Sequence, residues 1–191
     1  QLTGLNVSGL TALTHLDCSN NQLTGTLNVS GLPMLVHLNC DENQLTGLAL
    51  NQGAPYDIVF ARYNYMANTG AITGRTLNWD SGNFQFFPQY RRVSYDAHGG
   101  SGQMQADRAT DGVPFMLPQN RFTAPSGKRF DAWAIGDVSG QMKKAGEQHI
   151  FNADTTLYAI WYDPVTGVTL NKNTATLTVG GSETLTATVA P

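Results

Sequence analysis

The chain has 191 residues, of which 41% are hydrophobic, so it is long enough for one large domain or two to three small ones with true cores. Its formal net charge is −3, and only 13% of its residues are charged, about half the share in an ordinary soluble domain. This composition argues against nucleic acid as a partner and against a polybasic membrane anchor. The sequence has no apolar run of the roughly eighteen residues that a membrane-spanning helix needs, so we expect membrane association only through parts of a longer parent protein.

Two stretches near the N-terminus repeat almost the same sequence. "LTHLDCSNNQLTGL" begins at Leu13, "LVHLNCDENQLTGL" begins at Leu35, and a degraded third copy begins at Tyr56. The repeat asparagines recur after 22 and then 21 residues. Such a period predicts a solenoid in which each coil contributes one short parallel strand and the apolar repeat positions point inward. The aligned copies are Leu13-x-x-Leu16-x-Cys18-x-x-Asn21-x-Leu23, Leu35-x-x-Leu38-x-Cys40-x-x-Asn43-x-Leu45 and Tyr56-x-x-Val59-x-Ala61-x-x-Asn64-x-Met66.

This pattern resembles the bacterial leucine-rich repeat that carries Cys where Leu is more usual. The resemblance covers residues 1–66 and implies about three coils, with each repeat asparagine hydrogen-bonded to backbone where the chain leaves the strand. The main binding surface of such a solenoid is its concave sheet. Because side chains alternate along a strand, we expect that surface to carry nine residues: His15, Asp17, Ser19, His37, Asn39, Asp41, Ile58, Phe60 and Arg62.

The third row of this surface differs from the polar first two. Ile58, Phe60 and Arg62 include the residue types that anchor protein interfaces. The alternative is that this row packs against whatever closes the solenoid. Three coils offer less than the roughly 800 Å² per partner of a standard interface, so we expect upstream coils of the parent to contribute.

The only two cysteines lie in matching His-x-x-Cys sequences, which allows a Cys2His2 metal site, a disulfide or two buried thiols. His15 and Cys18 are three residues apart and therefore point to opposite faces of a strand, which argues against one ion bound by both. Cys18 and Cys40 would lie close enough for a disulfide, but stacked side chains point parallel to one another. We favour two buried thiols.

The stacked histidines form a second possible metal site. His15 and His37 should lie about 5 Å apart, flanked by Asp17 and Asp41, so a surface zinc or copper site is the alternative to two solvated imidazoles. No further residue is in place to fix the rings. We therefore predict no metal and no cofactor.

Between residues 67 and 92 the periodicity fails, and turn signals separate short apolar runs. Since a solenoid end must be covered, we expect a β-rich C-terminal cap. Its expected packing residues are Trp79, Phe84, Phe86 and Phe87, with an aromatic ligand site as the alternative.

Residues 93–163 resemble the internalin-type B repeat of bacterial surface proteins. The matching positions are Gly99-Gly100, Leu117-Pro118 with Phe122, Gly127 to Trp133, Ala145-Gly146 and Thr156 to Trp161, while His98 stands where asparagine is usual. The resemblance implies a small β-grasp fold.

The residues of this segment by themselves indicate three or four strands. Leu157, Ala159 and Trp161 should face one side of the last strand, with Tyr158 and Ile160 on the other. Phe130 and Trp133 can both reach the core only if a bulge or strand end separates them. We expect the mixed charges to form a solvated surface: Arg121, Lys128, Arg129, Lys143, Lys144, Asp107, Asp111, Asp131 and Glu147.

The last segment, residues 164–191, alternates apolar and polar residues around Gly180-Gly181, which predicts two strands and a turn. It resembles the opening third of a bacterial immunoglobulin-like domain of group 2. We therefore expect the chain to be an excerpt of a longer protein, and its fold class to be mainly β and multi-module.

No nucleophile with a base, no pair of carboxylates and no cofactor motif occurs at a credible spacing, so we predict that the chain is not an enzyme. The expected function is binding of a host or matrix protein or a glycan by an extracellular bacterial surface or secreted protein. The repeats would make the contact, and the other modules would act as spacers. The alternative is a set of spacer modules from an extracellular polysaccharide-degrading enzyme.

Overall fold

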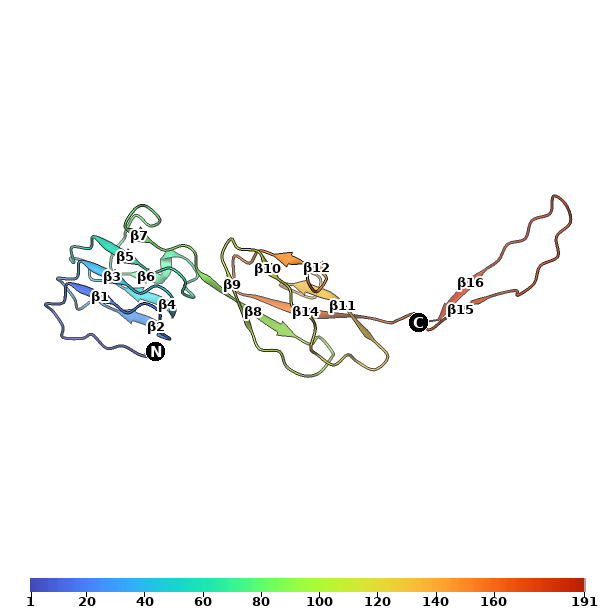
Figure 1. The fold of residues 1–191 in the computed structure, drawn as a ribbon, viewed down its shortest axis with the longest axis horizontal. Helices are drawn as coiled ribbons and strands as arrows, with labels where there is room; N and C mark the ends of the chain where they lie inside the picture. Colours follow the sequence, from blue (N-terminus) through green and yellow to red (C-terminus); the bar gives the residue numbers. More distant parts are fainter. Residues whose placement is uncertain (191) are drawn as a thin grey trace.

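The computed structural model describes residues 1–190, and these form a mainly β structure with a β-solenoid-like N-terminal part. The solenoid, a five-stranded sheet and a two-stranded ribbon follow one another along the long axis of the molecule (Figure 1). Within these residues the one helical element is the short 3-10 helix η1 (Thr69–Ala71). No helix in this range is long and apolar enough to cross a membrane.

Two parallel sheets form the solenoid. The first sheet contains, in order, β1 (His15–Asp17), β3 (His37–Asn39), β5 (Ile58–Phe60) and β7 (Phe84–Gln85). The second contains β2 (Thr24–Asn28), β4 (Gln44–Ala49) and β6 (Ile72–Thr73). A single hydrophobic cluster fills the solenoid, and its buried leucines are Leu23, Leu27, Leu32, Leu35, Leu38, Leu45, Leu48 and Leu50.

The repeat asparagines hydrogen-bond the backbone, as predicted. The fully buried Asn64 donates from Nδ2 to the carbonyl oxygens of Cys40 (3.0 Å), Ala61 (3.4 Å) and Arg62 (3.0 Å). Its Oδ1 accepts the Leu45 amide at 3.0 Å. Each asparagine therefore ties its own turn to the preceding coil, and equivalent bonds are made by Asn21 and Asn43.

The segment expected to be a β-rich cap adds a further strand to the solenoid. β7 pairs in parallel with β5, and the buried Gln89 takes the position of a repeat asparagine. Its Nε2 donates to the carbonyl oxygens of Ala61 (2.8 Å) and Phe86, and its Oε1 accepts the Met66 amide at 3.4 Å. The solenoid therefore extends beyond residue 66 by a further strand and turn.

The aromatic residues of this segment divide into two groups. Phe86 is fully buried, and Trp79 and Phe84 pack against the same core. Phe87 is 51% exposed, so its prediction as a packing residue was wrong. Phe87 lies beyond the end of β7, where its amide and that of Phe86 both donate to Asp80 Oδ1 at 2.9 Å.

The second part is a five-stranded sheet in the order β12-β11-β14-β8-β9. Its central strands, β8 (Tyr90–Asp96) and β14 (Thr155–Tyr162), are parallel, whereas β9 (Asp107–Thr110), β11 (Arg129–Ile135) and β12 (Gln141–Lys143) pair antiparallel. A separate antiparallel pair consists of β10 (Phe115–Met116) and β13 (Gln148–His149). This part of the chain therefore has more strands than the three or four that the sequence predicted.

Side-chain alternation in this sheet follows the sequence pattern. Leu157 and Ala159 are fully buried, whereas Tyr158 and Ile160 on the opposite face are half-buried. The expected bulge is confirmed, because the register of β11 shifts between Phe130 and Ala132. This shift brings the rings of Phe130 and Trp133 to 5.0 Å on the core side.

The turn after β8 contains two consecutive residues with positive φ angles. His98 and Gly99 have φ angles of 41° and 90°. Histidine is among the residues that enter this left-handed region more readily than most. His98 therefore fits the backbone conformation of this turn.

A buried ion pair joins the solenoid to the sheet. Arg91 in β8 donates from Nε and Nη2 to the two carboxylate oxygens of Asp111, each at 2.7 Å, and both side chains are under 10% exposed. Arg91 also donates to the carbonyl oxygens of Met66 (2.9 Å) and Ala67 (3.3 Å) in the solenoid. The expectation that Asp111 is solvated was wrong, because this carboxylate neutralises an arginine that closes the junction.

The C-terminal segment forms a ribbon of β15 (Gly167–Leu170) and β16 (Ala187–Ala190), paired antiparallel. A turn at Gly180 is present, with the Gly181 amide donating to the Thr178 carbonyl at 2.8 Å. The strands nevertheless form at the far ends of the segment rather than beside this turn. No residue from 164 to 190 is buried, so the ribbon has no core of its own.

Candidate functional site

The nine predicted surface residues lie together on the outward side of the first solenoid sheet, which we call the ladder face. The register places His15 beside His37 and His37 beside Ile58, and it places Asp17 beside Asn39 and Asn39 beside Phe60. The inward residues between them, such as Leu38 and Val59, are fully buried. The three remaining residues of this surface each lie two positions after the end of a strand: Ser19, Asp41 and Arg62.

The two histidines lie next to each other as predicted, with their rings edge to face, and His37 has a polar neighbour that was not expected. The ring centroids of His15 and His37 are 4.4 Å apart, and His37 Nε2 lies 3.4 Å from an oxygen of Asp57. Asp57 directly precedes β5, so it lies at the edge of the neighbouring coil. No group of three or more His, Cys, Asp or Glu side chains suited to a metal ion occurs in residues 1–190.

Among residues 1–190 neither Asp17 nor Asp41 forms an ion pair with a histidine, and each is hydrogen-bonded to other groups. Asp17 accepts the Ser19 amide at 2.9 Å and the Asn39 side-chain amide at 3.3 Å. The hydrogen bond from the Ser19 backbone is the main cause that lowers the pKa of the Asp17 carboxyl. Asp17 therefore orders the turn after β1 and links two coils.

Asp41 is buried and holds Arg62. It accepts the Arg62 backbone amide at 2.6 Å and the side-chain Nε and Nη2 at 3.0 and 2.6 Å. Only 11% of the Asp41 side chain is exposed, against 33% of the Arg62 side chain. Asp41 thus supports the surface rather than presenting a free charge, and Arg62 is fixed with its guanidinium 5.3 Å from the centre of the Phe60 ring.

Ile58 and Phe60 remain half-buried on this face. β7 continues the same sheet and places Gln85 beside Phe60, so it extends the surface instead of covering it. The ladder face therefore offers an apolar pair and a fixed arginine next to a polar histidine row. Gln85 and Asp57 were not predicted as part of this surface. Asp57 could have been found from the sequence, because it directly precedes a repeat strand, whereas nothing in the sequence pointed to Gln85.

The cysteines lie beneath this surface as free, buried thiols, in agreement with the favoured prediction. Sγ of Cys18 donates to the Asn39 carbonyl at 3.5 Å, and Sγ of Cys40 donates to the Phe60 carbonyl at 3.3 Å. Burial, followed by the nearby Asp17 charge, raises the pKa of Cys18 to about 11. Burial also raises the pKa of Cys40 well above its usual range, so neither thiol is prepared for metal binding or nucleophilic chemistry.

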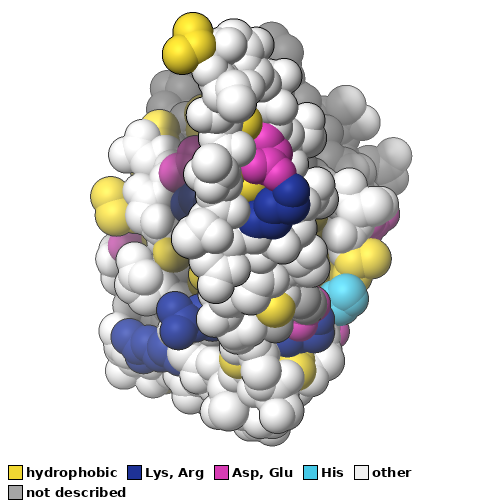
Figure 2. Space-filling view, turned by 90° about the vertical axis from the view of Figure 1, so that its right-hand side faces the viewer, with side chains coloured by type: hydrophobic (Ala, Val, Ile, Leu, Met, Phe, Trp, Pro, Cys, Tyr) yellow, Lys and Arg dark blue, Asp and Glu magenta, His cyan; other side chains and the backbone are white. Residues whose placement is uncertain are grey.

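Charged side chains elsewhere are dispersed. In the face that Figure 2 shows, basic, acidic and apolar side chains are scattered among neutral polar ones, without a large patch of one kind.

No protein-family model matches the chain, and comparisons with curated proteins and with solved structures give no match either. A functional conclusion therefore rests on the geometry of the chain itself.

Proposed function

We propose that this chain is a non-catalytic binding segment of an extracellular bacterial surface or secreted protein, and that its ladder face contacts a host or matrix protein. In this proposal residues 1–66 and the turn that follows them belong to a leucine-rich-repeat solenoid. The five-stranded part is a B-repeat-like β-grasp module, and the final ribbon is the start of an immunoglobulin-like domain.

The observation that carries the proposal is the Phe60 and Arg62 pair. Aromatic residues and arginine are the types that supply most interface energy. The Arg62 guanidinium is already held by Asp41 and stacked near Phe60, so binding would restrict it little further. Preorganisation of this kind raises affinity because less side-chain freedom is lost on association.

The second candidate is a spacer role in an extracellular polysaccharide-degrading enzyme. It is supported by the end-to-end arrangement of the three parts (Figure 1). A spacer has no need of a specific partner for its ladder face. Binding measurements on this face therefore separate the two functions.

The test is to screen the chain against a panel of extracellular-matrix proteins and glycans, together with an Ile58→Ala, Phe60→Ala variant. We leave Arg62 in place because its removal would strand the buried Asp41 carboxylate. A control variant, Val113→Ala with Met116→Ala, removes two exposed apolar side chains from the other module. We expect the ladder variant to bind its protein ligand at least tenfold more weakly, the effect of about 1.4 kcal/mol, and the control to bind as the wild type does.

Equal binding by the ladder variant and the wild type would exclude the ladder face as the site. The histidine row is tested separately by measuring binding at pH 6 and pH 7.5, since imidazole changes charge in this range. A pH effect that disappears in a His15→Ala, His37→Ala variant would show that the row takes part.

A further inference from the structure

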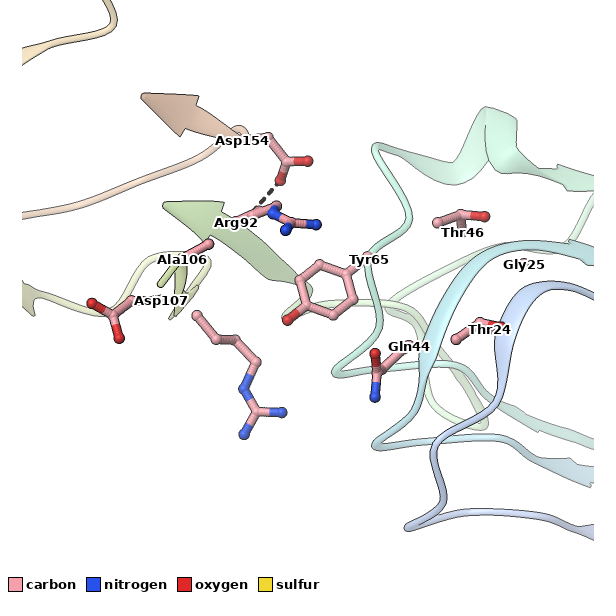
Figure 3. A pocket seen from close by; sticks show the side chains of 10 residues that line it. Thr24, Gly25, Gln44, Thr46, Tyr65, Arg92, Ala106, Asp107 and Asp154 are labelled. Carbon is pink, nitrogen blue, oxygen red and sulfur yellow. Dashed lines mark hydrogen bonds between the residues drawn. The ribbon is translucent and has the colours of Figure 1, made fainter. Parts of the chain in front are cut away.

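A polar cleft lies between the second solenoid sheet and the edge of the five-stranded sheet (Figure 3). Its volume is about 490 Å³. Thr24, Gln44 and Tyr65 line it on the solenoid side, and Arg92, Arg108 and Asp154 line it on the other. A second hollow of about 290 Å³ shares Gln44 and Arg108 and adds Tyr90. Spaces of this size accommodate small-molecule ligands.

Two arginines face each other in this cleft without a carboxylate partner. Arg92 and Arg108 are directly opposite in the antiparallel pair of β8 and β9, which sets their Cβ atoms about 5 Å apart, and like charges at such positions destabilise a sheet. Among residues 1–190 neither guanidinium forms an ion pair or a hydrogen bond, although Arg108 stacks over the Tyr90 ring at 4.1 Å. Each guanidinium therefore keeps five N–H donors available.

Three carboxylates lie nearby, Asp107 and Asp154 in the cleft and Glu42 in the second hollow, and none of them forms an ion pair with either arginine among residues 1–190. Asp154 accepts the Arg92 backbone amide at 2.8 Å, a bond that Figure 3 shows, and Asp107 accepts the Tyr95 hydroxyl at 2.5 Å. Both guanidinium groups are thus free to make charge-assisted hydrogen bonds to an anionic ligand.

The opposite wall suits a polyhydroxylated ligand. Within the described residues the side chains of Thr24, Gln44 and Tyr65 make no hydrogen bond, and Tyr65 projects from the solenoid toward the sheet module (Figure 3). The Tyr65 and Tyr90 rings are 5.8 Å apart. Aromatic faces with a polar tip, together with amide and hydroxyl groups, can contact both the ring and the hydroxyls of a sugar.

The junction holds the two walls in place. Arg91, the neighbour of Arg92, is fixed by Asp111 and by two solenoid carbonyl groups. The Tyr90 amide also donates to the Asn64 carbonyl at 2.6 Å. The site is therefore preformed, which reduces the cost of ordering it on binding.

We propose that this cleft binds an acidic oligosaccharide. Arg92 and Arg108 hold a carboxylate of the saccharide, Tyr65 and Tyr90 pack against its rings, and Thr24 and Gln44 contact its hydroxyls. The site is independent of the ladder face, since the two share no residue. Loss of binding at one surface is consequently distinguishable from loss at the other.

The test is isothermal titration of the whole chain with a trimer of galacturonic acid and with its methyl ester, which keeps the sugar rings but lacks the charges. An Arg92→Gln, Arg108→Gln variant removes the proposed anion contacts. Arg121→Gln with Arg129→Gln is the matched control, because these exposed arginines change the net charge equally and lie outside the cleft. Sodium sulfate alone is titrated as a simple anion.

We expect the acidic trimer to bind, and its ester to bind at least tenfold more weakly. The Arg92→Gln, Arg108→Gln variant should lose at least tenfold in affinity for the trimer, whereas the control should match the wild type. A Tyr65→Ala variant, which leaves both arginines intact, should also bind the trimer more weakly.

Four outcomes would overturn the proposal: no binding of the acidic trimer, equal binding of the ester, unchanged binding by the arginine variant, or sulfate binding as tightly as the trimer. The first three would remove the anionic site, and the last would remove the saccharide. Thermal unfolding of each variant checks that it is folded. Replacing two opposed, unpaired arginines should leave the unfolding temperature unchanged or raise it.

Discussion

Removing the Asp111 carboxylate should destabilise the protein strongly. An Asp111→Ala variant leaves the Arg91 guanidinium, with 5% of its side chain exposed, without its counter-charge. Breaking a buried ion pair from one side typically costs about 3–5 kcal/mol. Arg91 keeps two carbonyl acceptors, so we expect the lower end of that range, about 3 kcal/mol.

The assay is urea unfolding followed by tryptophan fluorescence, with Trp79 reporting on the solenoid and Trp133 on the sheet. A double variant, Arg91→Met with Asp111→Leu, removes both charges and keeps apolar volume. Its cost should be smaller than that of Asp111→Ala, because no charge remains buried. If Asp111→Ala changes the free energy of unfolding by less than about 0.5 kcal/mol, as surface substitutions do, the ion pair does not hold the junction.

Three further predictions concern other parts of the chain. Asn64→Ala should lower the free energy of unfolding by about 2–3 kcal/mol, measured by urea unfolding, because the Leu45 amide loses its buried acceptor; a loss below about 0.5 kcal/mol would contradict the asparagine's role. Cys18 and Cys40 should resist alkylation by iodoacetamide at pH 8 in the folded protein and react once it is unfolded, because burial raises both pKa values and keeps the thiols protonated; mass spectrometry that finds rapid native labelling would refute this. Limited proteolysis should cut after about Asp163 first, since no residue from 164 to 190 is buried, and a tail as resistant as the rest would contradict the interpretation.

The regular part of the solenoid could be predicted from the sequence because its signal is periodic. The spacing of Asn21, Asn43 and Asn64 indicated the coils, and strand alternation placed the ladder residues on one face. The next turn escaped notice because Gln89 follows Asn64 by 25 residues and has a different side chain. Its longer amide reaches equivalent carbonyl groups, which only the folded backbone reveals.

Partners that come from different coils or strands could not be predicted. Arg91 and Asp111 are 20 residues apart, and no repeat relates them. The partners of His37 and Asp41 could not be predicted for a similar reason, because Asp57 reaches His37 from the next coil and Arg62 reaches Asp41 from there too. The cleft depends on how two modules meet, and local sequence patterns contain no information about that arrangement.

The most direct test of the proposed function is amide hydrogen exchange, measured on the chain alone and bound to the matrix protein that the panel selects. We predict that binding slows amide exchange in β3, β5 and the turn through Arg62, and that exchange in β12 and the C-terminal ribbon is unchanged. A panel without any binder, or slowed exchange confined to segments outside the ladder face, would contradict the claim that this face recognises a protein.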